Sequence, residues 1–327
     1  MKNTYQDLIE QTFDFPQNGF EVIENELHFN NIPLMDIIKQ YGTPLKLTYL
    51  PKISEQINHA TTMFNVAMAK VNYEGNYTYC YCTKSSHYSF VLEEVLKNDT
   101  HLETSSAYDI DIIQSLFEAN KLNKDHYILC NGFKREPYLS GITDLIKNGF
   151  NVIPILDNKR ELTHYTSSIE DSKSINIGIR IASEEEPSFE FYTSRLGIRH
   201  NDIIEYYKSE VKPKENVNLK MLHFFINTGI KDTTYYWTEL HKALNIYCEL
   251  KKICPELDSL NIGGGLPFKN SLGFEFDYEY MIEEIIAQIK DYCNSKGVKE
   301  PNIFTEFGSF TVAESGVNIY SVIDVKP

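Results

Sequence analysis

A lysine, a glutamate and a run of three glycines each close a short apolar segment of the sequence, and each could do chemistry. Lys84 would be partly desolvated in an enclosed site, which lowers the pKa of an amine and frees it to form a Schiff base. The backbone of Gly263, Gly264 and Gly265 could approach a phosphate closely. Glu306 has aromatic neighbours, so its carboxylate needs a partner to stay ionised.

Each of these features also has a plain structural interpretation: a solvated lysine, a tight turn, or a glutamate paired with a nearby cation. Their combination is more specific than any one of them. An amine, a phosphate-binding loop and a buried carboxylate are the three attachments that pyridoxal phosphate needs, at its aldehyde carbon, its phosphate and its ring nitrogen. The sequence therefore predicts a pyridoxal-phosphate site if these residues converge. A phosphate-binding enzyme without a cofactor is the weaker alternative.

The elements that would bring them together repeat along the chain. Short apolar segments alternate with longer segments of helical periodicity, a pattern that indicates parallel strands covered by helices. Eight such units predict an α/β fold, a (β/α)8 TIM-type barrel, in which the carboxyl ends of all strands share one mouth. An open doubly wound sheet is the alternative, but the first strand is not followed by a glycine-rich turn. The predicted strands are residues 77–83, 101–105, 127–132, 151–157, 175–181, 219–226, 259–265 and 302–308.

Segments outside these units alternate like antiparallel strands. They are residues 20–30, 44–50 and 317–326. We expect residues 1–50 to contribute strands to a β domain, residues 51–315 to form the cofactor-binding barrel, and residues 316–327 to lead back to the β domain. Because the sequence stops there, we expect the chain to be the N-terminal portion of a longer polypeptide.

Composition excludes several classes of function. The 327 residues include 31 basic and 46 acidic side chains, a net charge of -15, which argues against nucleic acid or an anionic membrane as partner and favours a small cationic ligand. The six cysteines fit a reduced cytoplasmic protein, and their spacing predicts no metal site. Cys80 and Cys82 are expected to serve packing. The sequence contains neither a secretory signal nor an apolar run long enough to span a membrane.

The sequence resembles the alanine-racemase-type (fold type III) family of pyridoxal-phosphate decarboxylases that act on ornithine, diaminopimelate and arginine. The similarity runs from about residue 41 to the end. The motif at residues 129–134 is most similar to biosynthetic arginine decarboxylases. The matching motifs are Tyr41-Gly42-Thr43-Pro44-Leu45, Tyr81-Cys82-Thr83-Lys84 (the family's Y-A-x-K), Leu129-Cys130-Asn131-Gly132-Phe133-Lys134, Ile179-Arg180-Ile181, Ser194-Arg195-Leu196-Gly197-Ile198, Met221-Leu222-His223-Phe224, Leu260-Asn261-Ile262-Gly263-Gly264-Gly265 and Thr305-Glu306-Phe307-Gly308 (the family's E-P-G-R).

The resemblance implies roles for individual residues. Lys84 would bind the cofactor aldehyde and Glu306 would keep the pyridine nitrogen protonated, which makes these two the catalytic residues. Glu103 and Asp109 match acidic positions of the family. The full set expected to bind the cofactor is Lys84, Glu103, Arg180, His223, Phe225, Thr228, Gly263, Gly264, Gly265, Glu306 and Ser309.

The sequence departs from the family's pattern at two of these positions. Phe225 replaces a histidine that lies over the cofactor ring; a phenyl ring can stack there but cannot hydrogen-bond. Ser309 replaces the arginine of E-P-G-R, so one hydroxyl stands where the family has a bidentate cation. Thr228 retains a hydroxyl that could reach the phosphate.

By this resemblance the chain would decarboxylate a basic amino acid, with arginine to agmatine in polyamine biosynthesis as the leading expectation, and would act as a homodimer. Diaminopimelate and ornithine decarboxylases are the alternatives within the family. A non-catalytic relative that uses the barrel as a binding or regulatory module is the alternative outside it. The family's C-terminal β domain supplies residues to the partner subunit's site, so these 327 residues alone are expected to show little or no activity.

Overall fold

Eight parallel strands close into a barrel in the computed structural model, which describes residues 19–183, 196–271 and 273–324. The pairing runs from β9 through β11, β12, β13, β5, β6 and β7 to β8, and β8 pairs with β9 to complete the ring. This confirms the predicted (β/α)8 architecture. The strands are β5 (Tyr77–Cys82), β6 (His101–Thr104), β7 (Ile128–Cys130), β8 (Val152–Leu156), β9 (Ile175–Ala182), β11 (Val217–His223), β12 (Ser259–Asn261) and β13 (Asn302–Phe307).

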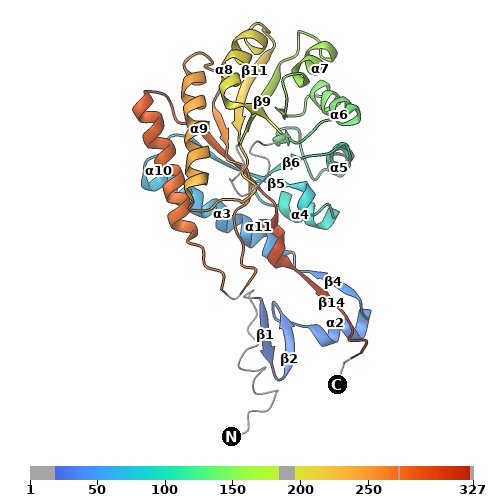
Figure 1. Ribbon diagram of the computed structural model, residues 1–327. Helices are drawn as coiled ribbons and strands as arrows, with labels where there is room; N and C mark the ends of the chain where they lie inside the picture. Colours follow the sequence, from blue (N-terminus) through green and yellow to red (C-terminus); the bar gives the residue numbers. More distant parts are fainter. Residues whose placement is uncertain (1–18, 184–195, 272, 325–327) are drawn as a thin grey trace.

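Helices surround these strands on the outside (Figure 1). The sequence pattern predicts helices over residues 89–97, 107–120, 138–149, 235–254 and 278–297, and the structure places α4, α5, α6, α9 and α10 there. It did not predict α3, whose apolar face packs under the barrel, or α7, whose threonines and serines are weak helix formers. The helices are α3 (Pro51–Lys70), α4 (Ser89–Leu96), α5 (Ala107–Glu118), α6 (Glu136–Lys147), α7 (Glu161–Ser168), α8 (Ile203–Tyr206), α9 (Thr234–Lys251), α10 (Tyr278–Lys296) and α11 (Ser309–Val312).

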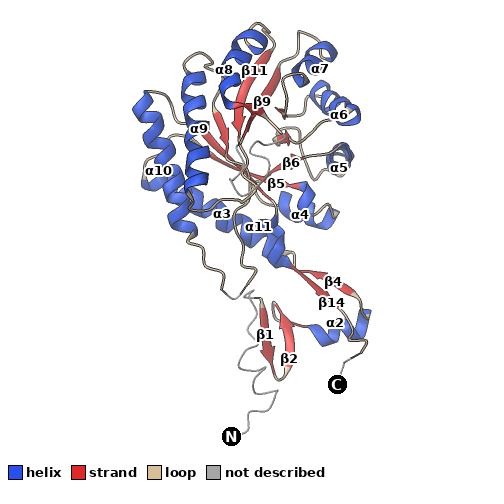
Figure 2. Ribbon diagram, in the orientation of Figure 1, coloured by secondary structure: helices blue, strands red, loops and turns tan. Residues whose placement is uncertain are grey.

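A small β region lies to one side of the barrel (Figure 2). Strand β4 (Leu45–Thr48) pairs antiparallel with β14 (Gly316–Ile319), so segments from the two ends of the described chain meet. The other elements of this region are β1 (Phe20–Ile23), β2 (Glu26–Phe29), β3 (Ile32–Pro33) and α2 (Leu34–Tyr41). In the barrel, a two-residue strand, β10 (Ile198–Arg199), pairs with β9.

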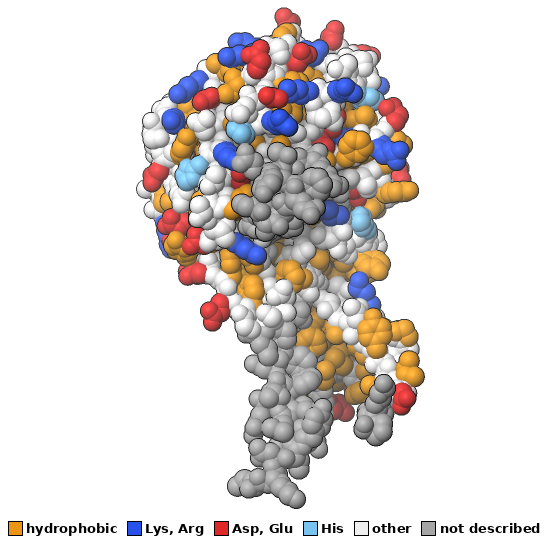
Figure 3. All heavy atoms as spheres, in the orientation of Figure 1, with side chains coloured by type: hydrophobic (Ala, Val, Ile, Leu, Met, Phe, Trp, Pro, Cys, Tyr) orange, Lys and Arg blue, Asp and Glu red, His pale blue; other side chains and the backbone are white. Residues whose placement is uncertain are grey.

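The two parts of the molecule differ in their surfaces. Over the barrel face drawn in Figure 3, Lys and Arg are interspersed with Asp and Glu and form no single basic patch. Hydrophobic side chains gather instead near the small β region, where Tyr41, Tyr320 and Val322 are each more than 60% exposed. Among the described residues, no helix combines the length and apolar character needed to cross a membrane.

The interior of the barrel is built in two layers, because successive side chains of a strand alternate between its two faces. The lower layer is an apolar cluster that is separate from the main core between strands and helices. Its members come from β5, β7, β8, β11 and β13: Cys80, Leu129, Ile153, Ile155, Met221 and Phe304. A second layer lies two residues further along these strands and holds the candidate site.

Candidate active site

Polar side chains form the layer at the carboxyl ends of the eight strands. Each lies on, or one residue beyond, the last residues of a different strand, and each is buried. Hydrogen bonds between strands that are not neighbours, such as Asn131 to Glu306 across from β7 to β13, show that these side chains meet inside the barrel. We call this set the polar layer: Cys82, Glu103, Asn131, Asp157, Arg180, His223, Asn261 and Glu306.

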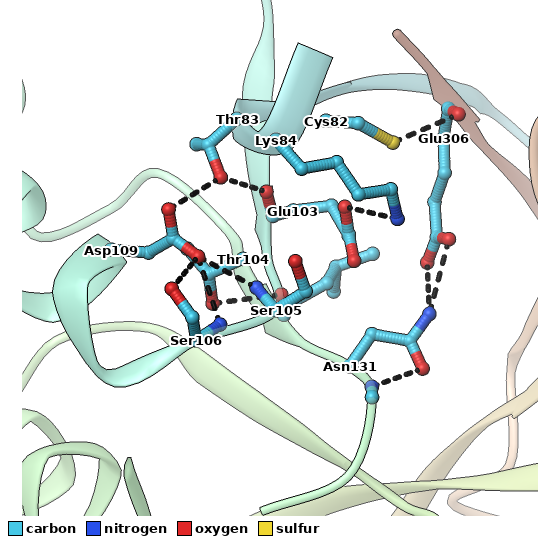
Figure 4. A network of polar contacts seen from close by, with 12 residues as sticks. Cys82, Thr83, Lys84, Glu103, Thr104, Ser105, Ser106, Asp109, Asn131 and Glu306 are labelled. Carbon is cyan, nitrogen blue, oxygen red and sulfur yellow. Dashed lines mark hydrogen bonds and ion pairs between the residues drawn. The ribbon is translucent and has the colours of Figure 1, made fainter. Parts of the chain in front are cut away.

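Lys84 reaches this layer from a turn of 3-10 helix, Thr83–Ser85, that follows β5. Its Nζ lies 3.4 Å from Oε2 of Glu103, and Figure 4 shows the side chain extending between Glu103 and Glu306. Burial by itself would lower the pKa of Lys84, as expected from the sequence. That expectation is wrong in sign, because Glu103, Cys82 and Glu306 outweigh burial and raise the pKa above its ordinary value.

The two carboxylates of the layer titrate in opposite directions. Burial, reinforced by the charge of Glu306, raises the pKa of Glu103 to about 8, although Lys84 opposes this. Burial also acts against ionisation of Glu306, but His223, Lys84 and the amide of Asn261 lower its pKa to about 2. At neutral pH the site therefore holds one firmly ionised carboxylate, Glu306, and one that readily takes a proton, Glu103.

Three buried side chains hold the Glu306 carboxylate in place. The Asn261 amide donates to its Oε1 at 2.7 Å, and the Asn131 amide donates to its Oε2 at 3.2 Å. Nε2 of His223 lies 3.3 Å from Oε2. Burial lowers the pKa of His223, which favours a neutral ring that donates a hydrogen bond rather than a second cation.

Neither asparagine was singled out from the sequence. A signal was available, because Asn131 follows the buried Leu129 by two residues and Asn261 follows the buried Ser259 by two, so the strand period places both amides inside the barrel. Asn261 has a second function: its Oδ1 accepts from the N–H of Gly263 at 2.9 Å, which links Glu306 to the glycine loop.

The three glycines pack against neighbouring backbone. A Cβ on Gly264 would lie 2.2 Å from the carbonyl oxygen of Glu306, and one on Gly265 would lie 2.6 Å from the Cα of Gly229. Gly263 and Gly265 also have positive φ angles, 73° and 89°. Only glycine fits such a loop. Among the described residues, the N–H groups of Gly264 and Gly265 have no protein partner, so both are available to an anion.

Arg180 and Phe225 lie together at the β9–β11 side of the mouth. The guanidinium is 5.7 Å from the centre of the Phe225 ring. Burial lowers the pKa of Arg180, and the charge of Asp157 opposes that effect. Arg180 pairs in register with His223, which is also a member of the polar layer.

Thr228 and Ser309 lie further out, on the rim. Together with Gly265 they line an open cavity of about 840 Å³ between the loops that follow β11 and β12. Ser309 is exposed and Thr228 half-buried. The structure therefore pairs Lys84 with Glu103 and His223 with Glu306, and it places the two hydroxyls at the edge of the adjoining cavity.

Two further residues of the matching motifs are tied into the scaffold. Asp109 accepts hydrogen bonds from Thr83 at 2.9 Å and from the N–H groups of Ser105 and Ser106, which fixes the loops after β5 and β6 (Figure 4). The buried ammonium of Lys134 is 3.0 Å from Glu161. Ser194 and Arg195 of the motif after β9 lie outside the described residues.

The arrangement fits a phosphorylated pyridine aldehyde. Three buried polar atoms of the layer, Oε1 of Glu103, Oδ1 of Asp157 and Nδ1 of His223, have no hydrogen-bond partner among the described residues. The layer thus offers unmet hydrogen bonds to a polar ligand. Lys84 supplies an amine, Glu306 an ionised carboxylate for a protonated ring nitrogen, and Gly264 and Gly265 supply free N–H groups for a phosphate.

Comparisons with known proteins agree with this interpretation. Residues 52–313 match the family model described as pyridoxal-dependent decarboxylase, pyridoxal binding domain. The chain is 25% identical over 303 residues to the biosynthetic arginine decarboxylase of Prochlorococcus marinus (strain MIT 9215), covering 87% of this chain and 46% of that protein.

Two of the solved structures that share the fold illustrate the similarity. The crystal structure of the biosynthetic arginine decarboxylase from Campylobacter jejuni has a TM-score of 0.75 and 24% identity, over 91% of this chain and 51% of that chain. Diaminopimelate decarboxylase from M. jannaschi has a TM-score of 0.78 and 18% identity, over 92% and 69%. The chain spans about half the length of the curated relatives it matches. Since the family model matches most of its residues, the chain belongs to the pyridoxal-dependent decarboxylases, with pyridoxal phosphate as the family's cofactor.

Proposed function

We propose that this chain takes part in the decarboxylation of a basic amino acid, with arginine as substrate and agmatine as product. The observation that carries the proposal is the pairing of Lys84 with Glu103 opposite a Glu306 that three side chains hold ionised. Family membership supports the reaction class. The motif at residues 129–134 and the arginine decarboxylases among the relatives support the substrate.

The residues of the polar layer have separate tasks in this proposal. When bound, pyridoxal phosphate supplies an electron sink for the charge left as carbon dioxide departs. Lys84 would attach the cofactor, and Glu306 would hold the proton on its ring nitrogen. Glu103, whose carboxylate lies 3.4 Å from the Lys84 ammonium, would orient this side chain toward the cofactor aldehyde.

Further parts of the proposal concern binding and assembly. Gly264, Gly265, Thr228 and Ser309 would bind the phosphate, and Phe225, beside Arg180, would face the cofactor ring. The net charge of -15 is compatible with a cationic substrate. We also propose a cytoplasmic homodimer in which residues 51–315 form the barrel and the flanking segments, 1–50 and 316–327, belong to a β domain.

The test is substrate exchange on the cofactor-loaded chain, followed by absorbance and by release of labelled carbon dioxide in a single turnover. Arginine is expected to displace the Lys84 linkage at a lower concentration than ornithine or diaminopimelate, because the linkage transfers to the substrate's amine. Because these 327 residues alone are expected to show little or no activity, release of carbon dioxide and agmatine should stay at trace level, and the order of the exchange concentrations identifies the substrate. Preference for another of the three amino acids would correct the substrate alone.

The control for this assay is Lys97→Ala, which removes an exposed lysine that is paired with Glu94 on the outside of the barrel. It should behave like the unaltered chain. Cofactor uptake with no response to any of the three amino acids would instead favour a binding or regulatory module. The phenylalanine at position 225 and the serine at position 309 are the features that favour that second candidate.

A further inference from the structure

Cys82 belongs to the polar layer but has no task in the proposed reaction. Its side chain is buried at the end of β5, and its register partner on β6 is Glu103. Its thiol donates to the backbone oxygen of Glu306 at 3.1 Å, and Figure 4 shows the sulfur directed toward that strand. The family's Y-A-x-K motif has alanine at this position. The thiol is therefore an addition relative to the family's motif.

The thiol and the two carboxylates converge. One ligand atom from each of Cys82, Glu103 and Glu306 lies within 4.8 Å of the others, and all three residues are buried. Metal–ligand distances of about 2.0–2.3 Å place the ligands of a tetrahedral zinc site about 3.3–3.8 Å apart. Closing the observed group onto an ion would need side-chain adjustments of about 1 Å. We call these three residues the Cys82 cluster.

Unmet charge in the cluster points to a cation. Oε1 of Glu103 is fully buried and has no partner among the described residues. Glu306 places a second buried carboxylate in the same cluster, beside the Cys82 thiol. Lys84 provides one positive charge at 3.4 Å, from a side chain that is 56% exposed.

We propose that the Cys82 cluster binds one zinc-class divalent ion when the cofactor is absent, and that the metal and the cofactor exclude each other. A thiolate with two carboxylates suits Zn²⁺ or Co²⁺, whereas Mg²⁺ and Ca²⁺ select sets of oxygen ligands. On binding, the Cys82 thiol releases its proton to solvent and water completes the coordination. The exclusion rests on the proposed function, since both ligands would need Glu306 and would compete with Lys84 for Glu103.

Cobalt reports such a site directly. Metal-free, cofactor-free protein titrated with Co²⁺ alone is expected to bind one ion per chain and to develop a thiolate-to-cobalt charge-transfer band, which Zn²⁺ then removes. Cys82→Ala should abolish the band and weaken Co²⁺ binding on the order of a hundredfold, since even residues behind the ligands contribute 10- to 100-fold. Cys80→Ala is the matched control, a buried cysteine two residues earlier on the same strand, and should change neither.

Two further variants keep the test valid if Cys82→Ala fails to fold, and circular dichroism will show whether each variant is folded. Cys82→Ser keeps the size of the side chain and should still lose the band. Lys84→Met removes the competing ammonium and should tighten Co²⁺ binding about tenfold. A charge-transfer band that persists in Cys82→Ala and Cys82→Ser, or an absence of Co²⁺ binding to folded protein, would overturn the inference.

A separate experiment tests whether the metal and the cofactor exclude each other. Protein whose cofactor has been fixed to Lys84 by borohydride reduction is expected to show no Cys82-dependent band, and simultaneous binding would refute the exclusion. A Cys82-dependent band in a chain that takes up no pyridoxal phosphate would leave the metal site standing and reject the proposed function. Cofactor uptake without a Cys82-dependent band would reject the metal site and leave the proposed function standing.

Discussion

The two layers inside the barrel lie on the same strands, two residues apart, but they differ in polarity and in what they contribute to the protein. The lower layer, which includes Met221 and Phe304, is apolar and closely packed. The upper one holds His223 and Glu306 on the same two strands, with unpartnered buried atoms and shifted pKa values. We infer that the lower layer stabilises the fold. The upper layer contributes less to stability and instead serves binding and chemistry.

Removing the largest side chain of the lower layer should have the largest effect on folding. Phe304 is 2% exposed and packs edge-on against Tyr127, with ring centres 5.3 Å apart. Phe304→Ala is expected to lower the free energy of unfolding by about 3–5 kcal/mol, measured by urea denaturation. Phe133→Ala, at a position 64% exposed, should change it by less than about 0.5 kcal/mol. Equal effects would erase the distinction between core and surface on which the comparison depends.

The upper layer should make stability depend on pH. The folded-state pKa of Glu103 is raised to about 8 from an ordinary value of 4.5, so the folded protein binds this proton more tightly than the unfolded one does. Stability of the cofactor-free protein should therefore fall as pH rises from about 4.5 to about 8, by on the order of a few kcal/mol. Glu103→Gln should flatten that fall.

At acid pH, the dependence of stability on pH is expected to have the opposite sign. Because the pKa of Glu306 is lowered to about 2, its contribution is present above pH 4.5 and is lost as pH falls toward 2. Glu103→Gln should leave this acid limb in place. A stability profile of the variant that coincides with that of the unaltered chain between pH 4.5 and 8 would contradict the assignment of the burial penalty to Glu103.

Loosening the carboxylate should cost cofactor affinity more than stability. Asn261→Ala removes the 2.7 Å hydrogen bond to Glu306 and the link to Gly263. A hydrogen bond to a charged group contributes about 1.5–3 kcal/mol, so the dissociation constant of pyridoxal phosphate is expected to rise about 10- to 100-fold in a fluorescence titration. Asn218→Ala changes the same residue type at the opposite end of the barrel and should leave the constant unchanged. A matching loss in that control would point to a general effect on folding.

The smallest predicted effect is a gain on the rim. Ser309→Arg introduces the guanidinium that the family's E-P-G-R motif has at this position, next to a cavity that Thr228 and Gly265 also line. Because Ser309 is exposed, we expect a modest improvement of about two- to fivefold in cofactor affinity, sensitive to salt. Ser271→Arg, on the same cavity but in the loop after β12, is the control. An equal gain in both variants would indicate general attraction of the phosphate.

The fold could be predicted from the sequence largely because buried parallel strands are apolar on both faces and recur at regular intervals. Helix α7 was not predicted because Thr163, Thr166 and Ser167 have low helix propensity, and tertiary packing overrides propensity there. The two-layer interior is also implicit in the sequence, since the period of a strand places a polar residue two positions beyond a buried apolar one on several strands.

The details of the site were less accessible. Lys84 and Glu306 stood out by their chemistry and their position at strand ends, and the family resemblance added Glu103. The sign of the Lys84 pKa shift could not be foreseen, because it depends on which carboxylate the β5–β6 register places beside the amine. The strand period could place Asn131 inside the barrel, and Cys82 was expected to serve packing, but the role of either side chain depends on its neighbours in space, which sequence spacing does not give.

The most direct test of the central claim is to load the chain with stoichiometric pyridoxal phosphate, reduce it with borohydride and locate the label by peptide mass spectrometry. The account predicts one phosphopyridoxyl group per chain, on the peptide that contains Lys84, and none in Lys84→Ala. A label on Lys134 or on a surface lysine, or an undiminished label in Lys84→Ala, would contradict the claim that the polar layer is the cofactor site.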